Sequence, residues 1–93
     1  MTYIETLKKA KEHNIDNLTL AIATECEYIF DFNYTDNEFN SICEFIRYCY
    51  LKAERVEIWQ LTKAVADEIE NGLTIDGVID LSYWDIIEKA VDY

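Results

Sequence analysis

Apolar residues recur at spacings of three and four through two long stretches in the middle of the chain, residues 36–53 and 57–71. Such spacing places them on one face of a helix. The first stripe is Phe39, Ile42, Cys43, Ile46, Cys49 or Tyr50, and Ala53, widened by Phe45, Tyr48 and Leu51. The second stripe is Ile58, Leu61, Thr62, Val65, Ala66 and Ile69. We predict two long helices joined by the short polar turn 52–55, packed antiparallel as a helical hairpin.

Residues at the ends of this pair support the same boundaries. Thr35 and Glu38 have the spacing of a capping box, in which each side chain binds the backbone amide of the other. Gly72 follows the second stripe at the position where helices commonly end in a left-handed residue.

The amino-terminal third predicts shorter helices. Thr2 and Glu5 form a second capping-box pattern, followed by a stripe of Ile4, Leu7 and Ala10. Asn17 is a candidate cap for another helix, which carries Leu18, Ala21, Ile22 and Ala23 and fades near Tyr28. Residues 29–34 then form an aromatic loop. The alternation of apolar residues over 17–34 also fits a short β-hairpin, although no glycine is available for its turn.

After Gly72, the pattern predicts a short helical turn that begins at Thr74 or Asp76. A last helix follows Ser82, with Trp84, Ile87 and Val91 facing inward.

Composition agrees with an all-α fold. The 93 residues contain no proline and two glycines, which disfavours sandwiches and barrels with many turns. We therefore predict residues 1–93 as one acidic domain, a small bundle of four to five helices built on the central hairpin. No apolar run is long enough for a membrane span. The odd number of cysteines and the absence of a signal-peptide layout favour reduced thiols and a cytoplasmic protein.

No pattern in the sequence indicates catalysis, a metal or a cofactor. The single histidine, His13, follows lysines at a predicted helix end, where a cation suits the helix dipole. Cys26, Cys43 and Cys49 lack zinc-site spacing and fit a buried apolar role. Residues 31–42 begin like a calcium loop, but Asp36 and Ile42 stand where that loop needs glycine and glutamate. We expect a protein that is not an enzyme and has no catalytic, cofactor-binding or metal-binding residues.

Charge is the most unusual property of the chain. The net charge of −11 disfavours direct binding to nucleic acids or anionic membranes, because both attract Lys and Arg. The acidic excess falls in residues 25–46, which contain no Lys or Arg, and in residues 64–93, where Lys89 is the only base. Asp85, Glu88 and Asp92 recur at helical spacing, so like charges repel on one face. This arrangement fits either a binding face or a merely solubilising one.

Aromatic residues give a second candidate surface. Tyr28, Phe30, Phe32 and Tyr34 either cover the helical pair or anchor a partner within an acidic rim. The candidate partner-binding residues are Glu25, Glu27, Tyr28, Phe30, Asp31, Phe32, Tyr34, Asp36, Glu38, Asp76, Asp80, Asp85, Glu88 and Asp92.

Two functional hypotheses compete. In the first, the protein binds and occludes a basic, nucleic-acid-binding surface of a partner protein, with carboxylates in place of phosphates and aromatic rings in place of bases. In length, acidity and absence of catalytic motifs, the chain resembles the small inhibitors that phages and mobile elements use against nucleases. In the second, it is an assembly module, either a helical homodimer or an accessory subunit, whose charge only keeps it soluble. A helix-turn-helix DNA reader fits the short helices but not the charge, since only Lys8, Lys9 and Lys11 cluster.

Overall fold

Two long helices, α3 (Asp36–Lys52) and α4 (Ile58–Glu70), form the centre of the computed structural model, which describes residues 17–93. Three further helices, α2 (Asn17–Ile29), α5 (Ile75–Ile79) and α6 (Tyr83–Ala90), each pack against both α3 and α4. The described residues contain five helices and no strand, which confirms the predicted all-α bundle. Predictions for the helix after Thr2 and for His13 lie outside the described residues.

The ends of the central helices lie within one residue of the predicted bounds. The Thr35 amide donates to Glu38 Oε1 at 2.8 Å, and the Glu38 amide donates to Thr35 Oγ1 at 3.2 Å, which confirms the capping box. At the end of α4, Gly72 has a φ of 105°, a region that L side chains rarely adopt. The Leu73 amide reaches back to the Glu68 carbonyl and the Gly72 amide to that of Ile69, which together form a Schellman motif.

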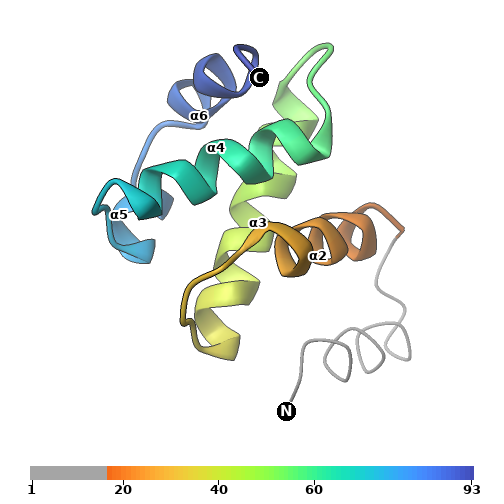
Figure 1. The fold of residues 1–93 in the computed structure, drawn as a ribbon. Coiled ribbons are helices and arrows are strands. Elements are labelled where there is room, and N and C mark those ends of the chain that lie inside the picture. Colours follow the sequence, from red (N-terminus) through yellow and green to blue (C-terminus); the bar gives the residue numbers. More distant parts are fainter. Residues whose placement is uncertain (1–16) are drawn as a thin grey trace.

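The relative orientation of α3 and α4 differs from the antiparallel pair that we expected. Figure 1 shows α4 crossing α3 steeply instead of running back along it. α2 packs against both helices at one side of the crossing and α6 at the other. A steep crossing gives each of the other helices contact with both α3 and α4. The connecting turn alone does not determine the crossing angle.

One face of every described helix packs into the hydrophobic core. From α3 the core takes Phe39, Ile42, Cys43, Phe45, Ile46 and Cys49, whereas Tyr48 and Leu51 are exposed and do not widen the stripe as predicted. In α4 the hydroxyl of Thr62 is buried and donates to the Ile58 carbonyl at 3.0 Å. This local bond satisfies a buried polar group.

The inward face of α6 was predicted only in part. Ile87 is buried as expected, together with Ile86 and Ala90, but Trp84 and Val91 are exposed. Apolar residues occur on all sides of this two-turn helix, so spacing alone did not identify the buried face. Ser82 caps α6, as predicted. Of the two predicted starts of α5, Thr74 is its cap and accepts the Gly77 amide at 3.0 Å, whereas Asp76 lies within the helix.

Residues 17–34 form α2 and a loop, so the alternative β-hairpin is wrong. In α2, Ile22, Ala23 and Cys26 are buried, whereas Ala21, one of the apolar residues of the predicted helix, is exposed. Within residues 17–93, no helix combines the length and the apolar character needed to cross a membrane.

Candidate protein-binding surfaces

The aromatic run after α2 divides into an inward cluster and one outward residue. Phe30 is only 7% exposed, and its ring lies 4.7 Å from that of Phe32, centroid to centroid. Tyr34 packs against Phe32 at 5.5 Å and against Phe39 of α3 at 5.6 Å. Tyr28, in contrast, is 89% exposed. Three of the four candidate anchors therefore cover the core, and Tyr28 alone presents its whole ring to a partner.

The first acidic run is distributed over the end of α2, the loop and the start of α3. The Glu38 carboxylate is engaged in the α3 cap, and Asp36 lies in the first turn of α3, where a negative charge suits the helix dipole. These two residues therefore contribute to helix stability. Glu25 and Glu27 are half-buried on α2, and Asp31 is exposed in the loop.

The second acidic run lies at the end of α4, on α5 and on α6. Lys89 Nζ binds Glu68 Oε1 at 2.7 Å and joins α6 to α4. Asp85 and Glu88 are exposed on α6, and Asp92 is exposed in the turn after it. None of these three carboxylates forms an ion pair with another described residue. Asp76 and Asp80, at α5, are exposed as well.

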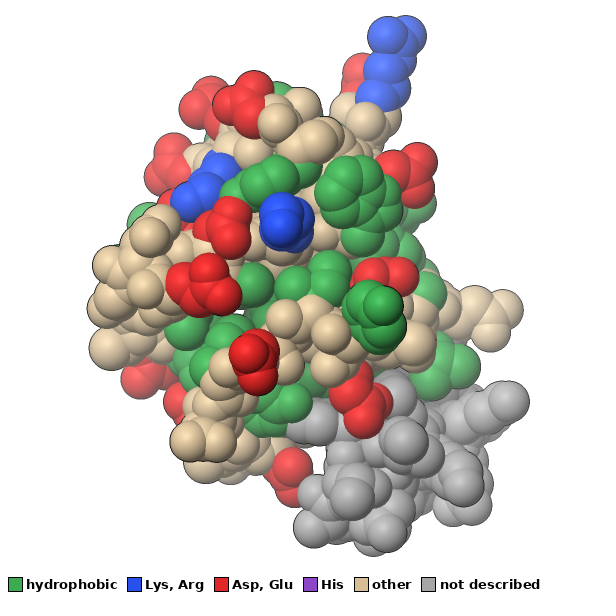
Figure 2. Space-filling model, viewed as in Figure 1, with side chains coloured by type: hydrophobic (Ala, Val, Ile, Leu, Met, Phe, Trp, Pro, Cys, Tyr) green, Lys and Arg blue, Asp and Glu red, His purple; other side chains and the backbone are tan. Residues whose placement is uncertain are grey.

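The two runs do not form one surface. α2 makes no contact with α5 or α6 among the described elements, and Figure 1 shows α4 between α2 and α6. On the face drawn in Figure 2, acidic side chains are spread over several helices, with hydrophobic side chains between them. A partner that binds through the acidic side chains would therefore contact either the α2 side or the α6 side of the molecule.

A groove of about 490 Å³ lies between α2 and α4, and the sequence did not predict it. Figure 1 shows the beginnings of these two helices close together at the right of the view. The groove is lined by Asn17, Leu20, Ala21, Thr24, Glu25, Tyr50, Glu57, Ile58 and Trp59. Its walls are mainly apolar, and Trp59 is 44% exposed. The available sequence signal was Trp59, which lies off the apolar stripe predicted for α4.

A second, smaller groove of about 240 Å³ lies between α3 and the α5–α6 region. Ser41, Glu44, Phe45, Tyr48, Ile79 and Tyr83 line it. The Tyr83 ring packs on Phe45 at 5.2 Å and on Tyr48 at 5.9 Å, and Lys52 Nζ lies 5.6 Å from its centre. Tyr83 thereby fills much of the space between these helices.

The cysteine side chains lie in the core. All three are free thiols, and Cys26 of α2 contacts Cys43 of α3 and Thr62 of α4. Burial raises the pKa of Cys26 well above its usual value, and contact with Cys43 raises it further. Burial also raises the pKa of Cys49 from 9.0 to about 12. Thiols in such surroundings stay protonated and are poor nucleophiles at neutral pH.

Within residues 17–93, no group of three or more His, Cys, Asp or Glu side chains is arranged to hold a metal ion. The chain matches no protein-family model, and neither the curated proteins nor the solved structures include a match.

Proposed function

We propose that this protein is a non-catalytic binding module that recognises and occludes a basic surface of a partner protein. The observation that carries the proposal is the state of Asp85, Glu88 and Asp92, which are exposed and have no ion pair with another described residue. Asp85 and Glu88 lie three residues apart on α6, and like charges at that spacing cost some local stability. Such costs are typical of functional surfaces. A positively charged partner would relieve this repulsion and would be steered toward the chain by its net charge of −11.

Exposed aromatic rings accompany the carboxylates on both sides of the molecule. On α6, Trp84 is 56% exposed and directly precedes Asp85. On α2, Tyr28 directly follows Glu27. Surfaces that bind nucleic acids combine cationic groups for phosphates with platforms for stacked bases. Carboxylates beside exposed rings have the chemistry that such a surface binds. We therefore favour a nucleic-acid mimic, cytoplasmic and of the phage or mobile-element type, that acts on a nuclease.

The test is capture from cell lysate by the immobilised full chain. We expect nucleases or other nucleic-acid-binding proteins to be retained, to elute with duplex DNA, and to bind less as salt rises, because salt screens charges over about 10 Å at 0.1 M. The triple variant D85N/E88Q/D92N tests the α6 side. Retention that is indifferent to salt and to DNA contradicts the proposal.

An assembly module is the second candidate, and the exposed apolar side chains favour it. Leu51, Trp59, Trp84 and Val91 are all large and exposed, and self-association would cover some of them. Sedimentation of the purified chain distinguishes the two. A stable dimer that persists in the triple variant, without retention of any basic protein, supports assembly.

A further inference from the structure

The groove between α2 and α4 combines mainly apolar walls with two acidic side chains. Leu20 and Ala21 come from α2, and Ile58 and Trp59 from the first turn of α4. Glu25 and Glu57 provide a carboxylate on each side. We propose that this groove binds an amphipathic helix of the partner that carries Lys or Arg beside its apolar residues. This inference rests on the proposed function and assigns to the α2 side of the molecule a contact of its own, separate from the carboxylates at α6.

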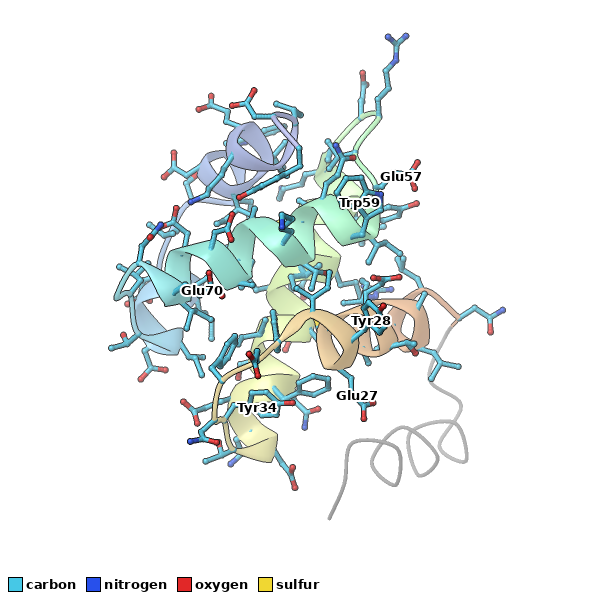
Figure 3. The ribbon with its side chains drawn as sticks, viewed as in Figure 1. Glu27, Tyr28, Tyr34, Glu57, Trp59 and Glu70 are labelled. Atoms are coloured by element: carbon cyan, nitrogen blue, oxygen red, sulfur yellow. The ribbon has the colours of Figure 1, made fainter. Side chains whose placement is uncertain are left out.

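The α2 wall extends beyond the groove itself. Leu20, Thr24 and Tyr28 are spaced four residues apart and therefore follow one another along the same face of the helix. α2 has 13 residues, which corresponds to a length of about 20 Å. Figure 3 shows Tyr28 on α2 and Trp59 on α4, with Glu57 next to Trp59. Trp and Tyr are among the residues that most often dominate binding energy at protein interfaces. Trp59 in the groove and Tyr28 on the adjoining face of α2 are therefore the candidate aromatic anchors.

The acidic side chains of the groove favour a basic ligand. Among residues 17–93, no Lys or Arg lines the groove, and α2 contains none along its whole length. Lys63 is the only base of α4, and its Nζ lies 5.5 Å from the centre of the Tyr93 ring, which is not part of the groove. A helix with basic flanks would place its charges against Glu25 and Glu57 while burying apolar side chains between them. A second copy of this chain would instead bring another net charge of −11 to the site.

The probe for the experiment is a synthetic amphipathic peptide of about 16 residues, long enough to form a helix when bound, with Leu on one face and Lys on its flanks. A twin peptide with Glu in place of every Lys controls for apolar binding. Binding is followed by tryptophan fluorescence in W84F, in which Trp59 is the only tryptophan. The W59F chain, which reports from Trp84 on α6, controls for binding elsewhere.

The deciding variant is Ala21→Arg, which places a long cationic side chain in the groove at an exposed helical position. Asn40→Arg makes the same change of charge type at an exposed position of α3 outside the groove and serves as the matched control. Circular dichroism establishes that both variants remain helical. Each variant is compared in the W84F background.

We expect the basic peptide to shift Trp59 emission to shorter wavelength and to bind A21R at least about tenfold more weakly, while N40R changes affinity less than about twofold. The Glu twin should bind far more weakly than the Lys peptide. Equal weakening by A21R and N40R, or a response of Trp84 alone, would show that the peptide does not bind in the groove. Either result would leave the proposed function intact. Absence of binding, or equal binding of the two peptides, would show that a basic amphipathic helix is not the ligand of the groove. If lysate capture also shows no basic partner, the proposed function fails with it.

Discussion

Gln60 ties the first turn of α4 to Tyr93. Its Nε2 donates to the Tyr93 backbone oxygen at 2.9 Å and to the Ala90 carbonyl at 3.3 Å. Its Oε1 accepts the Glu57 amide at 2.7 Å, so the same side chain also satisfies a free amide at the start of α4. One amide group thus fixes the end of α6 against the beginning of α4.

Replacing Gln60 with Ala should lower the free energy of unfolding by about 1–2 kcal/mol, because it removes hydrogen bonds at two helix ends. Gln60→Glu keeps the acceptor but removes both donors and sets a carboxylate against two backbone oxygens, so it should cost at least as much. Urea unfolding measures both values. A Q60E chain as stable as the parent would mean that the bonds to Ala90 and Tyr93 contribute nothing.

The Thr35 cap of α3 offers a second stability test. Thr35→Ala removes the acceptor of the Glu38 amide and should cost about 1 kcal/mol. Thr24→Ala is the matched control, since the Thr24 hydroxyl donates to the Leu20 carbonyl in the middle of α2, where alanine is the better helix former. We expect T24A to be neutral or slightly stabilising. Thermal or urea unfolding in which both variants lose equal stability would contradict the assigned role of the cap.

The cysteines predict a dependence of stability on alkaline pH. Cys49 has a pKa of about 12 in the folded protein, against 9.0 as its ordinary value, because burial disfavours the thiolate. Between these values the unfolded chain releases the Cys49 proton while the folded chain keeps it. The contribution of Cys49 to the free energy of unfolding is therefore fully present below about pH 9 and is lost as the pH rises toward 12.

The measurement is urea unfolding at several pH values from neutral to alkaline in the parent and in Cys49→Ala. The variant is expected to be less stable at neutral pH, because it leaves a cavity, but to lose less stability per pH unit above 9. Tyrosine ionisation, including that of the Tyr34 hydroxyl, whose pKa burial raises, acts in both proteins and cancels in the comparison. Parallel pH profiles would show that the Cys49 thiol ionises normally in the folded state.

Sequence patterns predicted most of the helices because their ends carry local signals. The capping residues Thr35, Thr74 and Ser82 and the glycine at 72 act within a few residues of themselves, so their roles follow from sequence. The crossing of α3 and α4 depends on contacts between distant segments, and no local signal encodes it. The groove arises from that packing, since Ala21 and Trp59 lie 38 positions apart in the chain and line one surface only in the folded protein.

The last prediction separates the structural and binding roles of the aromatic run. Phe30→Ala removes a ring that is almost fully buried and should lower stability by about 3–5 kcal/mol. Tyr28→Ala changes a side chain that is 89% exposed and should alter stability by less than about 0.5 kcal/mol. If Tyr28 extends the groove, Y28A should nevertheless weaken binding of the basic peptide to the W84F chain, while Tyr28→Phe should retain most of it. Unfolding curves and peptide titrations on the same samples decide the matter, and a Y28A chain with unchanged stability and unchanged peptide affinity would remove Tyr28 from the binding surface.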